Sequence, residues 1–302
     1  METPSLSRAN RPVQHRVIDG TLYARDTAPY AYDIRVHELG HGHTEATVLP
    51  RYGWSEVDNL SQFALADHEA SKGNIWSGGG WVPYVPTEED KLKKLTCNIE
   101  RSTRRARTKV RRLCKAKGLS VMLTLTYQEN MLDRDRMARD FDVFIKRVRR
   151  VSPGLQYVCV FERQKRGAWH AHIAVPRILS HYHKGGVLVR SYDLLRSMWR
   201  GVIGAGGNVD VSRNKRVGRS SAKLAGYLAK YIGKDIGAGG DGDSYRASGR
   251  ALPAAVVLRS HPVLWDAFCD LMKLISCDLT PSSRMHEAVL DTGGVFVCIS
   301  PS

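Results

Sequence analysis

Acidic residues are scarce relative to basic ones in this 302-residue chain. It has 30 Asp and Glu against 46 Lys and Arg, a formal net charge of +16. This excess favours a polyanionic partner, with nucleic acid as the first candidate and an acidic membrane surface as the second. No apolar run reaches the roughly 18–20 residues that a membrane span needs. The N-terminal stretch also lacks the hydrophobic core of a secretory signal. We therefore expect no membrane partner.

Cysteine motifs are missing too. The six cysteines are scattered, with no C-x-x-C pair and no dense framework. Such spacing favours reduced thiols in a cytoplasm over a disulfide-stapled secreted fold. The hydrophobic content of 42% and charged content of 25% are those of an ordinary globular protein. The length fits one domain with appendages, or two small domains.

The N-terminal region, residues 1–86, contains a motif that raises a peptidase alternative. His37-Glu38-Leu39-Gly40-His41 matches H-E-x-x-H, the zinc metallopeptidase signature, and His43 follows. That chemistry needs both histidines on one face of a regular helix, with the glutamate as general base. Gly40 and Gly42 each weaken a helix by about 1 kcal/mol, and Thr47 stands where a third histidine ligand would fall. We expect short strands and irregular structure here and rank the peptidase last.

Residues 87–118 predict a long basic helix. Three acidic residues in its first turn complement the helix dipole, and Leu92, Leu95 and Ile99 recur at helical spacing. Between Arg101 and Lys117 there are nine basic residues and no acidic one. A run of this kind repels itself, which favours contact with phosphates over a merely solvated helix face. The candidate DNA contacts on this helix are Arg104, Arg105, Arg107, Arg111 and Arg112.

The following residues, 119–236, predict a single α+β domain. Its expected elements are a strand at Val121–Tyr127, a helix at Asp133–Val151, two strands within Gln156–Val175, a helix at Ser191–Val202 and a strand at Asn208–Ser212. The order β-α-β-β-α-β predicts a ferredoxin-like, RRM-like antiparallel sheet with helices on one face. Residues 237–252 predict a flexible Gly-rich linker. Residues 253–302 predict an accessory segment with one helix and a strand.

The hairpin Gln156–Val175 carries the first chemical motif, His170-Ala171-His172. Strand side chains alternate, so two histidines one residue apart point to the same face. A three-residue loop at Lys165-Arg166-Gly167 places Glu162 opposite His170 and Val160 opposite His172. One carboxylate and two imidazoles can hold a divalent metal and leave positions open for a substrate oxygen. The alternative is two partly exposed histidines without a metal.

The stretch Ser220–Asp235 carries the second motif, on a predicted helix that follows the fourth strand. At about 100° per residue its tyrosines and lysines share one face, next to an apolar arc that docks on the core. Tyrosine, with a reference pKa near 10, is a weak nucleophile unless lysines and a metal-polarised phosphate assist it. The alternative is a semi-buried tyrosine pair with lysines around it. The residues on the polar face are Lys223, Tyr227, Lys230, Tyr231 and Lys234.

Taken in order, these motifs resemble those of the HUH endonucleases, specifically the rolling-circle replication initiators of single-stranded DNA phages and plasmids. Three segments carry the resemblance over about residues 120–235: Leu123–Tyr127, His170–His172, and Tyr227–Tyr231 with Lys234. The paired tyrosines, four residues apart, resemble the two-tyrosine phage subgroup. A Walker A pattern is missing, so the fused helicase of some relatives is not expected.

The resemblance implies a specific chemistry. His170 and His172 would bind Mg²⁺ or Mn²⁺, with Glu162 completing the set, while Lys230 and Lys234 assist and Lys223 contacts DNA. Tyr227 or Tyr231 would nick single-stranded origin DNA, leaving a 5′-phosphotyrosine link and a 3′-OH primer. A host helicase and a host DNA polymerase would be the partners, in the cytoplasm of a bacterial cell. A non-catalytic basic DNA-binding protein remains the alternative.

Overall fold

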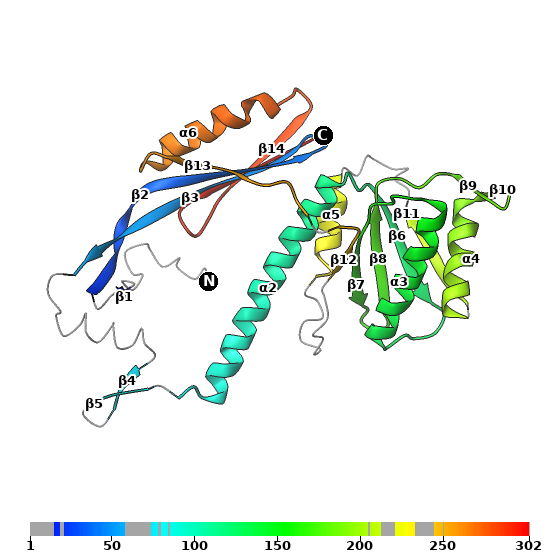
Figure 1. The fold of residues 1–302 in the computed structure, drawn as a ribbon, viewed down its shortest axis with the longest axis horizontal. Coiled ribbons are helices and arrows are strands. Elements are labelled where there is room, and N and C mark those ends of the chain that lie inside the picture. The colour runs from blue at the N-terminus through cyan, green and yellow to red at the C-terminus, as the bar shows by residue number, and fades with distance from the viewer. Residues whose placement is uncertain are drawn as a thin grey trace, which may run out of the picture.

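The structure, a computed structural model, consists of two antiparallel sheets on either side of a long helix, α2 (Figure 1). It describes residues 15–18, 21–57, 74–77, 80–83, 85–204, 206–212, 221–232, 245–249 and 251–301. This confirms the predicted α+β class with antiparallel sheets. Among the helices in these ranges, none is long and apolar enough to cross a membrane.

The first sheet is formed by the predicted central domain. In chain order its elements are β6 (Val121–Tyr127), α3 (Arg134–Val151), β7 (Val158–Arg163), β8 (Trp169–Val175), α4 (Ser191–Ile203) and β11 (Gly207–Ser212). The strand order is β11-β6-β8-β7, and every neighbouring pair is antiparallel. A hairpin that the sequence analysis did not predict, β9 (His181–Lys184) with β10 (Val187–Arg190), precedes α4.

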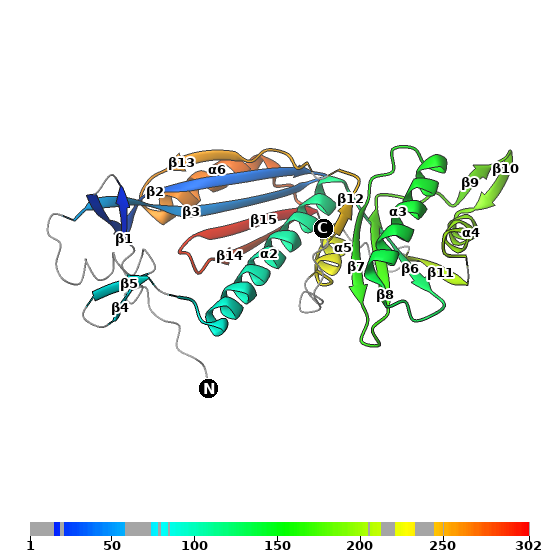
Figure 2. The ribbon, with the colours of Figure 1, turned by 60° about the horizontal axis from the view of Figure 1, so that its bottom comes forward.

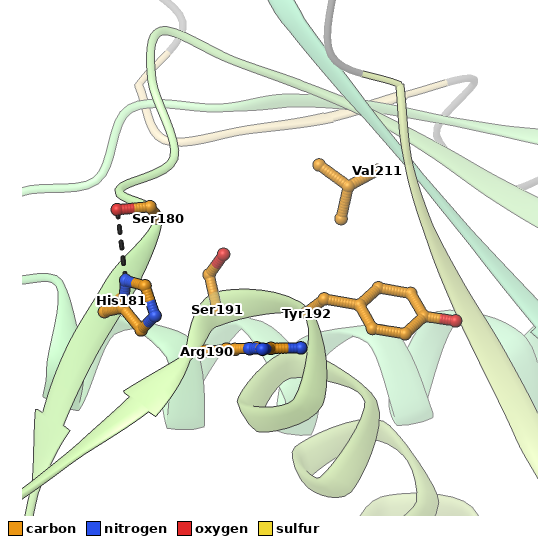
Figure 3. Close-up of a pocket in the computed structure, with 6 residues that line it drawn as sticks. All are labelled: Ser180, His181, Arg190, Ser191, Tyr192 and Val211. Carbon is orange, nitrogen blue, oxygen red and sulfur yellow. Dashed lines mark hydrogen bonds between the residues drawn. The ribbon is translucent and has the colours of Figure 1, made fainter.

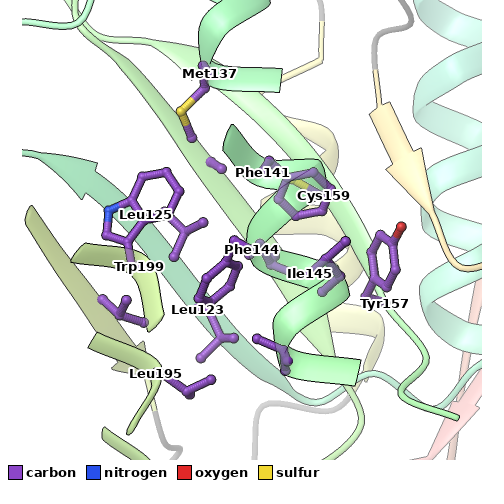
Figure 4. Packing of buried hydrophobic residues seen from close by; sticks show 14 of the residues in the cluster. Leu123, Leu125, Met137, Phe141, Phe144, Ile145, Tyr157, Cys159, Leu195 and Trp199 are labelled. Atoms are coloured by element: carbon purple, nitrogen blue, oxygen red, sulfur yellow. The ribbon is translucent and has the colours of Figure 1, made fainter. Parts of the chain in front are cut away.

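Helices α3 and α4 cover one face of this sheet (Figure 4). Phe144 of α3 meets Trp199 of α4 edge to face with ring centroids 5.7 Å apart, and both side chains are fully buried. Alternate strand residues such as Leu123 and Ile173 complete this core because strand side chains alternate between the two faces. The intervening residues, among them His172, therefore point to the opposite face.

Helices α2 (Glu88–Ala116) and α5 (Ser221–Ala229) lie on that opposite face. Thr87 and Asp90 form a capping box at the start of α2, which satisfies backbone N–H groups of its first turn. The buried residues of the two helices pack on Val158, Val160 and Ala174 of the strands. The sheet is thus covered on both sides, and the tyrosine helix shares a face with the histidines.

Two predictions about the end of the central domain need correction or lie outside the structure. Helix α5 ends at Ala229, not at Asp235, and Tyr231 lies in a turn closed by i→i−3 backbone bonds. Lys234 and most of the predicted linker 237–252 lie outside the described residues. The described part of that range includes β12 (Tyr245–Ala247), which pairs with β7 and extends the first sheet.

The second sheet joins the two ends of the chain. Its strands are β1 (His15–Ile18), β2 (Thr21–Gly40), β3 (His43–Glu56), β13 (Val256–Ser260), β14 (Ser283–Val289) and β15 (Val295–Pro301). Residues 256–260 pair with β2, and residues 295–299 pair with β3. The expectation of short strands is therefore wrong for residues 21–56. A separate small hairpin consists of β4 (Asn74–Ser77) and β5 (Gly80–Pro83).

Helix α6 (Leu264–Ile275) covers one face of the second sheet. Its Ala267, Leu271 and Ile275 pack on buried Ile34 and Val48 of β2 and β3. Helix α2 meets the other face, and Figure 2 shows it running on the side of the sheet away from α6. The predicted helix and strand of the C-terminal segment are confirmed as α6 and β15.

The H-E-x-x-H segment forms a strand end and a tight turn. Strand β2 ends at Gly40, His41 adopts a positive φ of 52°, and β3 begins at His43. His37 and His41 therefore do not share a face of a regular helix, which the zinc peptidase chemistry requires. The peptidase alternative is wrong.

The same segment instead connects the second sheet to α2. Buried Glu45 of β3 accepts hydrogen bonds from Lys115 Nζ at 2.7 Å and from Arg112 Nε at 2.8 Å. Burial alone would raise the pKa of the Glu45 carboxyl, but its ion pairs with Lys115 and Arg112 outweigh burial and lower that pKa. Arg112 Nη1 also lies 2.9 Å from His37 Nε2. We call this contact, together with His43, the inter-sheet joint.

Candidate active site

The two histidines of β8 lie side by side on the face of the first sheet that α5 covers. The register of the hairpin places Glu162 opposite His170 and Val160 opposite His172, as the sequence predicts. Gly167 closes the loop with a φ of 92°, which favours glycine. Both imidazoles are buried, at 7% and 6% exposure.

His172 has a partner at each ring nitrogen. Its Nε2 lies 2.8 Å from Oε2 of Glu162, and its Nδ1 lies 3.2 Å from the hydroxyl of Thr124 on β6. The carboxylate contact runs diagonally across the strand pair, since Glu162 stands opposite His170 in the register. The pair thus joins an imidazole and a carboxylate on one patch of the sheet.

His170 lies beside this pair at the end of the hairpin. Its Nδ1 is 3.2 Å from Nε2 of Gln164. The pKa of His170 is lowered by burial first and by neighbouring His172 second. A neutral imidazole is the form that binds a metal ion.

Tyr231 places its ring directly on His172. The two rings are stacked, with centroids 4.3 Å apart and planes 9° apart. Tyr227, one turn earlier, meets Tyr231 edge to face at 5.1 Å. The tyrosines thus contact the face that carries the histidines, although the helix carrying them is shorter than predicted.

The two tyrosines differ in exposure. Tyr231 is 9% exposed, whereas Tyr227 is 37% exposed. Burial, followed by a hydrogen bond to Tyr227 and the nearby charges of Tyr227 and Glu162, raises the pKa of Tyr231. Tyr227 therefore presents the more accessible hydroxyl, and Tyr231 lies between it and the imidazole of His172.

The residues fit a divalent metal by their chemistry but do not enclose one as they are placed here. Two neutral imidazoles and a carboxylate are suitable ligands for Mn²⁺ and are compatible with Mg²⁺. Within the described ranges, no three His, Cys, Asp or Glu side chains converge into a metal-binding group. In this arrangement Glu162 and His172 bind each other, and both would have to turn toward an ion to share it.

The predicted DNA contacts on α2 divide into two groups. Arg104 and Arg105 are exposed, as is Lys223 on α5, so these three are available to a nucleic acid. Arg107 donates through Nε to the carbonyl of Ile232 and holds the turn after α5. Arg112 belongs to the inter-sheet joint, with its side chain 19% exposed. Arg111 is partly buried, and its Nε has no hydrogen-bond partner.

A hollow of about 330 Å³ lies elsewhere, between β9, α4 and β11 (Figure 3). Val211, one of its lining residues, pairs with Leu123 and packs on the α3–α4 core. The hollow therefore opens on the side of the sheet away from His172. Its residues are Ser180, His181, Arg190, Ser191, Tyr192 and Val211.

The comparison with protein families concerns the same domain. Residues 120–236 match the model of the ORF2-type family of replication-associated proteins. Over this domain the chain is similar to replication-associated proteins. The matched range includes β6, the histidines of β8 and both tyrosines, and it supports a protein of the Rep type. Comparison with curated proteins and with solved structures gave no match.

Sequence reasoning missed several residues that hold the site. Gln164 and Thr124 bond the two histidines, and the inter-sheet joint reaches α5 through His43 and Ser221. Thr124 could have been found, since it lies on the alternate face of a predicted central strand. Gln164 adjoins the predicted hairpin loop. The joint connects residues more than 170 positions apart, and nothing local in the sequence indicates it.

Proposed function

We propose that this chain is a replication initiator that nicks single-stranded origin DNA by attack of a tyrosine on a phosphate. The observation that carries the proposal is the contact series Tyr227–Tyr231–His172–Glu162 on one sheet face. Nucleophile candidates and metal-ligand candidates, more than 50 residues apart in sequence, meet there. The match to replication-associated proteins supports the same conclusion.

The proposed step forms a bond between a tyrosine oxygen and phosphorus and breaks the bond from phosphorus to the 3′ oxygen. The phenol loses a proton and the departing 3′ oxygen gains one, so atoms and charge balance. The product is a 5′-phosphotyrosine link with a free 3′-OH, which a host polymerase would extend after a host helicase opens the duplex. A second transfer of the same kind would rejoin the displaced strand.

In this proposal Tyr227 attacks first. Its hydroxyl is the more exposed of the two, whereas the phenol of Tyr231 is buried and bonded to Tyr227. Tyr231 would serve the second transfer, as in the two-tyrosine HUH type. Lys230 is exposed beside Tyr231 and is placed to neutralise phosphate charge, and the same role is proposed for Lys234.

His170, His172 and Glu162 are the residues that would hold Mg²⁺ or Mn²⁺. The ion, when bound, supplies positive charge that polarises the phosphate for attack. The protein side of this site is ordered by its surroundings: Gln164 orients His170, and Thr124 with the ring of Tyr231 orients His172. Strand order β11-β6-β8-β7, with α3 and α4 on one face, supports a ferredoxin-like arrangement beneath it.

The test is a covalent adduct. The protein is incubated with Mg²⁺ and labelled single strands of the replicon that encodes it, and SDS-resistant complexes are separated on a gel. We expect an adduct that mass spectrometry maps to Tyr227 or Tyr231. Nicking that persists after both tyrosines are replaced by phenylalanine would refute the nucleophile assignment. Binding without any adduct would favour the non-catalytic DNA-binding alternative.

A further inference from the structure

One face of the second sheet has no described helix over most of its width. Helix α6 packs on the face that contains Ile34, Val48 and Val297. The residues that alternate with these point to the other face, where α2 reaches only the inter-sheet joint through Arg112 and Lys115. The open face lies on the same side as the exposed basic part of α2 (Figure 2).

Arginines dominate this open face. Arg259 of β13 stands opposite Asp33 of β2, and Arg35 of β2 lies two residues further along the same face. Arg51 of β3 adjoins them, and Arg284 of β14 lies on the far side of the sheet. All four arginines are exposed, whereas Asp33 is 6% exposed.

Three of these arginines converge on one buried carboxylate. Asp33 is 3.0 Å from Arg51, 3.7 Å from Arg259 and 4.0 Å from Arg35. One arginine would neutralise Asp33, so two positive charges remain in excess. The carboxylate also fixes the directions of the guanidinium groups, each of which has five N–H donors and geometry suited to phosphate.

The charge of the whole face is strongly positive. It has six basic side chains, Arg35, Arg51, Arg259 and Arg284 with Arg112 and Lys115 of the joint, against two acidic ones, Asp33 and Glu45. The sum is 6 − 2 = +4. Such excess over a rigid sheet is complementary to a polyphosphate backbone.

The spacing of the arginines favours duplex over single-stranded DNA. From β2 to β14 there are three strand spacings, or about 14 Å at 4.8 Å each, close to the roughly 12 Å width of the major groove. Single-strand binding relies on exposed aromatic rings for base stacking. Among the positions of this face that the register defines, Phe296 carries an aromatic ring, and it is only partly exposed.

We propose that this open face binds the phosphate backbone of duplex DNA next to the strand that the tyrosines cut. The inference rests on the proposed function for the identity of the cut strand. The occupant is double-stranded DNA, bound through phosphates and without base readout. The inter-sheet joint holds this face and helix α5 in one body, so duplex contact would position the single strand at Tyr227.

The experiment compares two double variants of the full chain. Arg35→Gln with Arg259→Gln removes the two excess charges and keeps Arg51, the nearest partner of Asp33. The control, Arg136→Gln with Arg139→Gln, removes the same charge from exposed positions on α3. Affinity for a fluorescein-labelled duplex of arbitrary sequence is measured by anisotropy between about 50 and 200 mM salt.

We expect the slope of log affinity against log salt to fall by about 1.8 in the first variant, since each lost phosphate contact accounts for about 0.9. At 0.1 M salt this corresponds to roughly 60-fold weaker binding if affinities converge at 1 M. Adduct formation with a purely single-stranded oligonucleotide should stay at the wild-type level. Equal duplex affinity in the two double variants would overturn the proposal.

A second variant guards against a folding defect. Arg284→Gln lies far from Asp33 on exposed β14, and it should lower the slope by about 0.9 with an unchanged melting temperature. No change in its slope would also count against the face. If wild-type protein forms no adduct with any strand and yet duplex binding still requires Arg35 and Arg259, the proposed nicking function fails while the duplex surface stands.

Discussion

His43 Nε2 and the hydroxyl of Ser221 lie 2.5 Å apart and connect the second sheet to the first residue of the tyrosine helix. The other nitrogen of the same imidazole lies 3.2 Å from the hydroxyl of Ser300 on β15. His43 is 2% exposed. One buried side chain thus bonds a strand from each end of the chain and the start of α5, so the second sheet helps to place Tyr227 and Tyr231.

Replacing His43 with alanine should therefore weaken both stability and nicking. Two buried hydroxyls lose their partner, which we expect to lower the free energy of unfolding by about 1–3 kcal/mol. Adduct formation should slow as well, because α5 loses a contact at its first residue. The control is His183→Ala, at an exposed histidine of β9. Wild-type adduct rates in His43→Ala would show that the joint does not position the helix.

The same histidine predicts a specific dependence of stability on pH. Burial, followed by the charge of Lys115, lowers the pKa of His43 to about 4, from 6.5 for an ordinary histidine. The unfolded chain therefore binds a proton between these two values while the folded chain does not. Stability from neutral His43 is fully present above pH 6.5 and is lost as pH falls toward 4, by at most about 3 kcal/mol. Chemical denaturation across this range should show a smaller acid loss in His43→Gln than in wild type.

Glu45 should be among the most sensitive positions in the chain. Its carboxylate is 1% exposed and holds both Arg112 and Lys115, and the side chain of Lys115 is itself 8% exposed. Glu45→Gln leaves a buried ammonium group without its countercharge, which costs about 3–5 kcal/mol. The control Glu38→Gln, at an exposed glutamate of β2, should be nearly neutral in urea unfolding. Adding Lys115→Met to Glu45→Gln should restore much of the loss, and failure to do so would locate the cost outside this ion pair.

The two tyrosines should differ in their effect on the first cleavage. Tyr227 is exposed, whereas Tyr231 is buried against His172. Tyr227→Phe should abolish the adduct in a single-turnover reaction with one oligonucleotide. Tyr231→Phe keeps the ring stacking and should retain first-round adduct while losing the rejoining step. The opposite pattern, with the adduct lost only in Tyr231→Phe, would exchange the two roles.

Local patterns predicted the first sheet well because each of its elements is fixed by its own residues. The strand Val121–Tyr127 has the predicted bounds, and the register of Glu162 with His170 follows from loop length and alternation. The tyrosines and histidines share a face because that alternation and the helical spacing are both local. The helix end was misplaced at Asp235 since its last residues have helical spacing, while the turn after Ala229 is held by Arg107 from a distant helix.

The second sheet could not be predicted because its pairing is non-local. Strands β2 and β13 are separated by more than 200 residues, and so are β3 and β15. The polar residues of β2 and β3 looked like a metal motif or irregular structure. Their partners, Arg112 and Lys115, were read instead as part of a DNA-binding helix. Buried ion pairs of this kind appear only once the sheet and the helix are placed together.

Metal binding gives a test of the histidine patch that does not depend on DNA. Mn²⁺ added to metal-stripped protein is followed by the loss of its free-ion electron paramagnetic resonance signal. We expect His172→Ala to abolish binding, since it removes a proposed ligand and the partner of Glu162. Gln164→Ala removes only the contact that orients His170, so it should weaken affinity by about 10–100-fold. Glu162→Gln keeps a side-chain oxygen near His172 but loses the charge, and wild-type affinity in this variant would remove Glu162 from the proposed ligand set.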